Sequence, residues 1–451
     1  MRKNYLSLAA IAGVGSAIGI MCYYLNNYVG GCIFICMSLA LFMLAKRIKG
    51  NILNFLGVFS LVWFFTIGLS CFMLHSSQTI WNIQTWLCLV MAYIMFCLGY
   101  AIKPSKNRDS HNKKFITKKN FVAFLATIFT LSLGGFIVES VIRGGIPLFS
   151  SDMASYADFG VTGIHYFTVS SCLFLPASII YLKFFHKEMR KIDYLIIIIA
   201  NIIMLAIPIA IVSRQLLIAT VIISSIVFLT LFPKYTVATI IIVTAAMSAG
   251  WIFITTQRNQ TDEYLQSALA IYGDEFTDDD KAILTNTRLM QVYMYLACNY
   301  DNLNENIGNI DEYTFGKRTF FPVIALTGLK YATPSLGEMP NLSRFIPVFN
   351  TYPIIMAPYA DFGIVGVAVY MLLIGMICGY LDMDIDRLRK RPITILIRAI
   401  FMYAIIFSFF SNWFANPTTV FYVLLLYILC RFFFSSKVLT ISNSAKGENV
   451  S

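Results

Sequence analysis

The chain carries little charge for its length. Only 13% of its 451 residues are Asp, Glu, Lys or Arg, whereas 58% are hydrophobic and 15% are aromatic. A soluble domain has about a quarter charged residues and has no core large enough to bury this much apolar surface. The composition therefore excludes an ordinary soluble enzyme and predicts an integral membrane protein. Because lipid offers no hydrogen bonds to the backbone, its membrane spans must be helices.

Residues that form metal sites or disulfides are also scarce where they would be useful. The four histidines, His75, His111, His165 and His186, have no metal-ligand spacing. Every cysteine except Cys298 lies in an apolar stretch, so no disulfide framework is expected. The chain also lacks a Gly-rich phosphate loop, a dinucleotide fingerprint and a G-x-S-x-G motif. We expect no structural metal, no cofactor, and neither ATP-driven nor serine-hydrolase chemistry.

What the chain does have is a series of long apolar stretches. A spanning helix needs roughly 20 apolar residues. Stretches of this kind lie at 4–25, 28–45, 51–73, 84–102, 120–140, 164–184, 194–212, 214–232, 236–256, 355–380, 393–411 and 419–435. The predicted fold class is an all-α polytopic membrane protein with about twelve transmembrane helices.

The basic residues predict the orientation of these helices. Most Lys and Arg fall in loops on one side, above all in 103–119, and the positive-inside rule places that side and both termini in the cytoplasm. The net charge of +11 mainly reflects this asymmetry, so nucleic acid is not an expected partner. The first apolar stretch lacks a small-residue cleavage site and is predicted to be a retained helix.

The domain organisation follows from one long interruption. Residues 1–256 are predicted to hold spans one to nine, 257–354 a large extracytoplasmic loop, 355–435 the last three spans, and 436–451 a cytoplasmic tail. The loop is expected to be part-helical without forming an independent domain. Its acid cluster near Asp278 is expected to begin a helix that runs to Asn299.

Arginines on the extracytoplasmic side are informative because the positive-inside bias opposes them. Three stand at turns or at the start of the loop and three within it: Arg143, Arg214, Arg258, Arg288, Arg318 and Arg344. A guanidinium binds phosphate oxygens with two parallel donors and keeps its charge. We therefore expect these cations to bind the phosphate or diphosphate of a membrane lipid. For Arg214 the alternative is a snorkelling residue that only limits how deeply the turn enters the bilayer.

Glycosyl transfer from a lipid diphosphate would use such cations. The departing diphosphate gains charge as its bond to the sugar breaks, and preorganised cations stabilise that charge without a metal. The acceptor hydroxyl must lose a proton to a group within hydrogen-bond reach. Asp361, at the mouth of the tenth span, is the first candidate for that base, with structural pairing to an arginine as the alternative. Asp152 and Asp158 are second, and His165 is third.

Four motifs in a fixed order resemble a known family. They are Gly144-Gly145-Ile146-Pro147-Leu148 after a mid-chain span, Ser213-Arg214 between adjoining spans, Arg258 at the start of the loop, and Tyr359-Ala360-Asp361-Phe362-Gly363-Ile364-Val365-Gly366 where the chain re-enters the membrane. This arrangement resembles the oligosaccharide repeat-unit polymerases, the Wzy-type polymerases of O-antigen and capsule synthesis. The resemblance covers most of the chain from about residue 120, and the first four spans carry no matching motif.

The resemblance implies a specific activity. Such glycosyltransferases move a growing glycan from undecaprenyl diphosphate to a newly exported lipid-linked repeat unit, on the outer face of the bacterial cytoplasmic membrane. Implied partners are the undecaprenyl-diphosphate-linked oligosaccharide, membrane lipid, a flippase and a chain-length regulator. The implied catalytic residues are Arg214, Arg258 and Asp361. Substrate-binding roles are extended by position to Arg143, Gly145, Pro147, Arg288, Arg318, Arg344 and Tyr359.

Two other classes of protein share part of this pattern. A lipid-linked oligosaccharide flippase also has about twelve spans, but alternating access usually rests on two repeated halves, and no internal repeat is evident. An O-antigen ligase has similar topology and chemistry, and its mark would be a histidine in the late external loop. Residues 257–355 contain no histidine. Both observations favour the polymerase.

Overall fold

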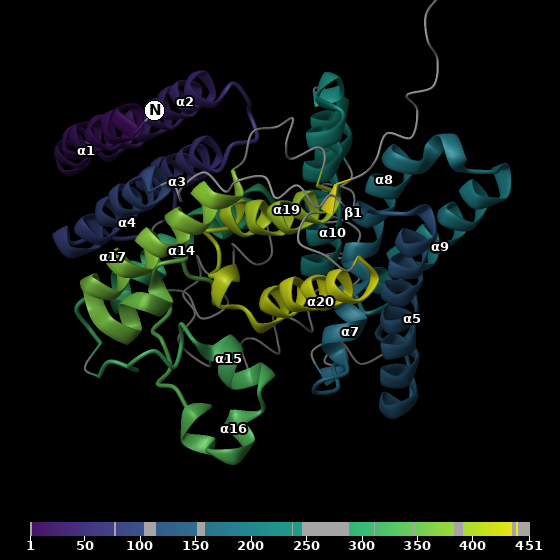
Figure 1. Cartoon of the computed structure of the whole chain (residues 1–451). Coiled ribbons are helices and arrows are strands. Elements are labelled where there is room, and N and C mark those ends of the chain that lie inside the picture. The colour runs from purple at the N-terminus through teal and green to yellow at the C-terminus, as the bar shows by residue number, and fades with distance from the viewer. Residues whose placement is uncertain are drawn as a thin grey trace, which may run out of the picture. The chain divides into compact units, whose positions relative to one another are not determined.

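A computed structural model describes the chain over most of its length (Figure 1). The described residues are 2–75, 78–102, 114–150, 158–236, 238–245, 288–310, 312–345, 349–382, 391–434 and 439–440. Within them helices dominate, and the two strands, β1 (Lys114–Phe115) and β2 (Leu439–Thr440), pair in parallel over two residues each.

Eight segments of the described chain are long and apolar enough to cross a membrane. They are α1 (Arg2–Leu25), α2 (Asn27–Lys49), α4 (Ile83–Ala101), α5 (Lys118–Arg143), His165–Glu188, α9 (Lys191–Ala210), α10 (Arg214–Leu231) and α17 (Met356–Leu381). The segment His165–Glu188 contains α7 (His165–Val169) and α8 (Phe174–Phe185). The expected multi-pass all-helical class is thereby confirmed.

The remaining expected spans differ from this group. Shorter apolar helices occupy three of the twelve positions: α3 (Phe55–Cys71), α19 (Pro392–Ile406) and α20 (Pro417–Phe433). The expected span at 236–256 lies largely outside the described residues. The twelve-span count and the orientation of the termini therefore stay predictions.

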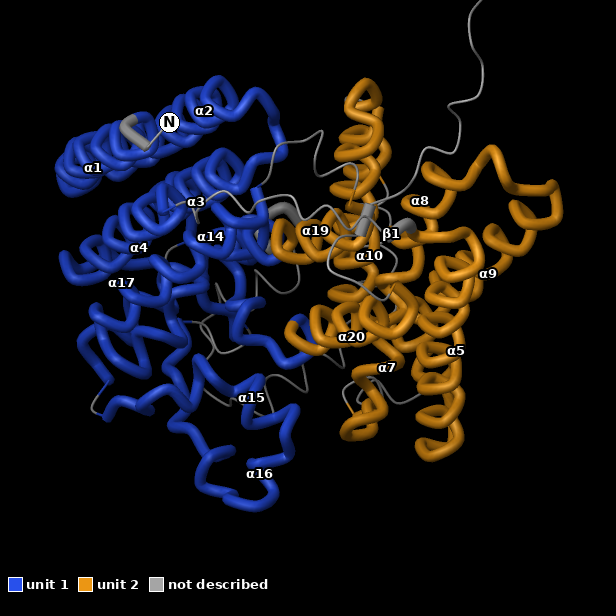
Figure 2. The backbone as a smooth tube through the Cα atoms, in the orientation of Figure 1, with its two compact units in different colours: residues 1–105, 261–382, 404–419 blue, residues 106–260, 383–403, 420–451 orange. Residues whose placement is uncertain are grey.

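The chain divides into two compact units, coloured separately in Figure 2. Unit 1 comprises residues 1–105, 261–382 and 404–419, and unit 2 comprises 106–260, 383–403 and 420–451. Each unit combines segments from distant parts of the sequence, so the division does not follow the order of spans and loop along the chain.

In unit 1, α17 packs closely along α4 (Figure 1). Glycines allow this approach: a Cβ added at Gly99 would lie 2.0 Å from the carbonyl oxygen of Leu372, and one added at Gly375 would lie 2.2 Å from that of Phe96. Small residues at such contacts are typical of helices packed within membranes, because they let two backbones come close together. This packing fixes the position of α17, which carries Asp361.

The predicted loop helix is present as α14 (Arg288–Asn306), which also packs on α3. It ends seven residues later than the expected end at Asn299, and residues 278–287 lie outside the described part. The Nδ2 of Asn302 donates to the carbonyls of Phe349 and Thr351 at 2.7 and 2.8 Å, and Asn306 bonds Ser343 in the same way. These two side chains lie in the roughly two extra helical turns and hold the returning chain. Along the sequence, two short helices, α15 (Phe321–Leu326) and α16 (Leu329–Ala332), follow α14 and precede the returning chain.

In unit 2, α5 packs against α7, α8 and α9, and α10 packs against α8. Phe121 and Phe124 of α5 are fully buried and contact the ring of Phe434. The Tyr422 hydroxyl of α20 donates to the carbonyl of Val169 at 2.9 Å. These contacts hold the first turns of α5 and the end of α7 within unit 2.

Candidate functional site

The Gly-Gly-Ile-Pro motif ends α5. Gly144 adopts φ 72°, a left-handed conformation that suits glycine, and Gly145 N donates to the carbonyl of Ser140 at 3.0 Å. Pro147 then begins the 3₁₀ turn Pro147–Phe149. The chain therefore turns tightly at the end of α5, and this turn places Arg143 at the exposed end of the helix.

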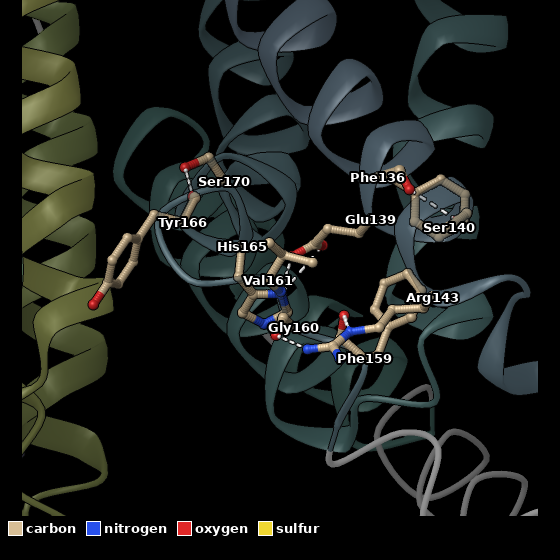
Figure 3. A network of polar contacts seen from close by, with 10 residues as sticks. All are labelled: Phe136, Glu139, Ser140, Arg143, Phe159, Gly160, Val161, His165, Tyr166 and Ser170. Carbon is tan, nitrogen blue, oxygen red and sulfur yellow. Dashed lines mark hydrogen bonds and ion pairs between the residues drawn. The ribbon is translucent and has the colours of Figure 1, made fainter.

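One turn before Arg143, Glu139 forms a polar network with the start of α7 (Figure 3). The Glu139 side chain is 0% exposed, and its Oε1 accepts from Val161 N at 2.8 Å. The Nδ1 of His165 lies 3.1 Å from Oε1 and 3.3 Å from Oε2. The His165 side chain is 39% exposed. A carboxylate at Nδ1 orients an imidazole and leaves Nε2 as its basic atom.

Arg143 fastens the intervening segment to the end of α5 (Figure 3). Its Nε donates to the carbonyl of Phe159 at 3.2 Å and its Nη2 to that of Gly160 at 2.8 Å. A Cβ at Gly160 would lie 3.1 Å from the His165 ring, so glycine permits this close packing. The guanidinium therefore holds the backbone that in turn binds Glu139.

The structure brings together two residues that the sequence singled out, Arg143 and His165, around one that it missed. Glu139 escaped notice because it lies inside the apolar stretch 120–140. An acid within a spanning segment is costly unless it is paired or has a function. The presence of an acid in this apolar stretch is therefore the sequence signal that points to Glu139.

Arg214 lies at the first position of α10, in the same unit. Ser213 caps the helix by accepting from Leu216 N at 3.3 Å, and Val212 adopts φ 53° to close the turn from α9. The guanidinium is partly buried at this turn. Arg258 and Asp152 lie outside the described residues, as does the side chain of Arg288. Asp158 is described and exposed.

Asp361, in unit 1, is fully buried and is bound by a turn of the loop. Its Oδ1 accepts from the Thr314 hydroxyl and from Arg318 N at 3.2 Å, and its Oδ2 accepts from Thr319 N at 2.7 Å. Backbone amides and a hydroxyl thus bind the carboxylate, and the arginine that takes part, Arg318, does so through its backbone amide.

The helix breaks directly after Asp361. Phe362 has φ −146° and ψ 17°, and Gly363 has φ 62° and ψ −151°, a region open almost only to glycine. A Cβ at Gly363 would also lie 2.8 Å from the Tyr313 hydroxyl. The break lets the loop turn 314–319 reach Asp361, which explains why glycine follows the acid by two residues.

Two loop arginines converge on Tyr352. The Tyr352 hydroxyl donates to the carbonyl of Ser343 at 3.0 Å. Burial raises its pKa, which a hydrogen bond from Arg344 and the charges of Arg344 and Arg318 partly counteract. Burial lowers the pKa of Arg318, while Asp361 and Tyr352 oppose that shift.

The Arg318 side chain also has unused donor capacity. It donates through Nη2 to the carbonyl of Pro340, and its buried Nε has no hydrogen-bond partner among the described residues. Tyr359 is oriented differently, with its hydroxyl at the Gly308 backbone. Arg318 and Arg344 therefore belong to one cluster, and Tyr359 contacts another part of unit 1.

No group of three or more His, Cys, Asp or Glu side chains that could hold a metal ion occurs in the part of the chain that the structure describes. Comparison of the chain with protein-family models, with curated proteins and with solved structures gave no match.

Proposed function

We propose that the chain is a membrane glycosyltransferase that polymerises lipid-linked oligosaccharide repeat units on the outer face of the bacterial cytoplasmic membrane. The observation that carries the proposal is the pair formed by buried Glu139 and half-exposed His165. It lies one turn from the Gly144–Pro147 motif that is part of the family resemblance. A carboxylate-oriented imidazole is suited to remove a proton from a hydroxyl group.

In the proposed reaction, His165 Nε2 takes the proton of an acceptor sugar hydroxyl. The acceptor oxygen forms a bond to the anomeric carbon of the donor glycan, and the bond from that carbon to the lipid diphosphate breaks with its electron pair leaving on the diphosphate. Glu139 stabilises the imidazolium that forms, as a buried carboxylate does beside other catalytic histidines. Arg143 acts as a positioning residue, because its donors hold the segment that binds Glu139.

The departing diphosphate requires positive charge. Arg214 and Arg258 are assigned this role, and removal of one such group typically costs about 3 kcal/mol of transition-state stabilisation. Within unit 1, the cluster of Arg318, Arg344 and Tyr352 supports binding of an anionic lipid group by the loop. The Nε of Arg318 is buried and has a donor to spare, which an anionic oxygen could accept.

The test is polymer length in cells that lack their own polymerase. His165→Asn, which keeps a polar side chain of similar size but no basic ring nitrogen, should reduce the polymer to single repeat units at normal protein level. The matched control is His186→Asn, since His186 is exposed and lies at the far end of the segment that begins with His165. A full-length polymer from His165→Asn would refute the assignment of the base.

The cation assignment has its own test in the same cells. Arg214→Ala and Arg258→Ala should each shorten or abolish the polymer, whereas Arg190→Ala, at an exposed arginine before α9, should not. Long polymer from both the Arg214 and Arg258 variants would rule out the arginine mechanism.

A further inference from the structure

Three exposed phenylalanines gather where the loop meets α17. Phe315, Phe320 and Phe362, here called the Phe cluster, are 77%, 59% and 44% exposed. The rings of Phe315 and Phe362 lie 6.4 Å apart, edge to face. A Cβ added at Gly316 would lie 3.0 Å from the Phe320 ring and 3.5 Å from that of Phe362. The cluster therefore joins two loop residues to a residue of the spanning helix.

Beyond the helix break at Phe362 and Gly363, an exposed apolar stripe runs along α17. Exposed side chains recur every three or four residues along one face of this helix: Val365, Val369, Leu373, Ile377 and Tyr380. Fifteen residues of helical rise make this stripe about 23 Å long, most of the roughly 30 Å of a bilayer's hydrocarbon core. The stripe has the length and composition of a lipid-facing surface, and Phe362 marks its loop-side end.

The loop is held so that Phe315 extends this surface. Thr314 N donates to the carbonyl of Ala360 at 3.0 Å, and Asp361 binds the rest of the turn. Phe315 itself adopts φ 47°, a conformation that aromatic residues rarely take. An unfavourable backbone angle that leaves a large apolar ring 77% exposed indicates that the ring has a partner outside the chain.

We propose that the Phe cluster inserts among the phospholipid acyl chains of the leaflet nearest the loop. Its occupant is bilayer phospholipid because the cluster continues the lipid-facing stripe of α17. Lys317, on the same turn, supplies a positive charge at the level where anionic headgroups would lie. The loop is then anchored to the membrane at this turn as well as through its two ends. This inference does not depend on the proposed glycosyl transfer.

The test is fluorescence quenching in vesicles of phosphatidylcholine brominated on its acyl chains. Phe315→Trp and Phe320→Trp are compared with Phe362→Trp, on the spanning helix, and with Tyr331→Trp, on α16, where the side chain is 63% exposed. Each signal is measured in the full chain as the difference from the wild type. We expect the added tryptophan at 315 and 320 to be quenched like that at 362, and at least twofold more than that at 331.

Three results would overturn the proposal. Tryptophans at 315 and 320 that behave like the one at 331, while the one at 362 is quenched, would place the turn in water. Quenching that unbrominated polyprenyl diphosphate relieves at equimolar amounts would assign the cluster to a substrate's tail. Tryptophans at 315 and 320 that are shielded from water only when the protein self-associates would assign the Phe cluster to a contact with a second copy.

Discussion

Glu139 and Asp361 are two buried carboxylates near the ends of long apolar helices, and they are satisfied in opposite ways. Both are 0% exposed. Glu139 binds an imidazole that reaches the surface, whereas both oxygens of Asp361 accept hydrogen bonds from one turn of the protein. A carboxylate connected to the surface through a titratable ring is equipped for proton transfer, and one enclosed by amides is equipped to hold a loop. The partner of a buried acid, more than its burial, therefore indicates its role.

The largest expected effect comes from removing the charge of Glu139. Glu139→Gln keeps the size of the side chain but cannot stabilise an imidazolium, so the polymerisation rate should fall by about 100-fold or more. The rate is measured on purified protein with lipid-linked repeat units. Glu188→Gln, at an exposed acid in the same unit, is the control and should be near wild type.

The same change at Asp361 should act on stability first. Asp361→Asn replaces an acceptor of amide hydrogen bonds by a group that must donate, and a charged hydrogen bond contributes about 1.5–3 kcal/mol. We expect a lower thermal midpoint and faster proteolysis within 314–319, with residual polymerisation at low temperature. Loss of activity with unchanged stability and proteolysis would return Asp361 to the catalytic group and break the comparison.

Gly363 tests whether the helix break serves Asp361. Gly363→Ala forces a side chain into a strained conformation beside the Tyr313 hydroxyl, at a cost of about 1–3 kcal/mol. Gly134→Ala in α5, where the added Cβ meets nothing within 4 Å, should be neutral or stabilising. Both free energies of unfolding come from denaturant titration in detergent. Equal effects at the two positions would show that the break is not required.

A third buried carboxylate, Asp301 of α14, sharpens the comparison by its pH dependence. It accepts from Trp81 Nε1 and Gln78 Nε2, both at 2.8 Å, and burial raises its pKa to about 7. The pKa of an aspartate in the unfolded chain is about 3.9. The contribution of Asp301 to the free energy of unfolding is therefore complete below about pH 3.9 and is lost as the pH rises through about 7.

The thermal midpoint measured between pH 5 and 8 checks this prediction. The free energy of unfolding should fall by at most about 1.4 kcal/mol per pH unit over that interval. Asp301→Asn should be less stable at pH 5 and show a flatter pH profile. A wild-type profile that rises from pH 5 to 7 would contradict the assignment.

The spanning helices could be predicted because the hydrocarbon core requires long apolar runs, and most of those runs became helices of nearly the expected bounds. The partners of Asp361 could not, because Thr314 and Thr319 lie more than forty residues away in the sequence and no local pattern links them to it. Glu139 was hidden for a different reason: one acid hardly alters the hydrophobicity of a 26-residue helix. The extension of α14 beyond Asn299 depends on contacts of Asn302 and Asn306 with the returning chain, which only folding brings together.

Glycan chain growth by the purified full-length protein tests the central claim most directly. The protein is reconstituted with polyprenyl-diphosphate-linked repeat units, and the products are separated by length. We predict glycans of two or more repeats on one lipid together with free polyprenyl diphosphate, and neither product from the His165→Asn variant. Repeat units that stay single, whether they cross the bilayer intact or are passed to an acceptor without a lipid diphosphate, would contradict the account.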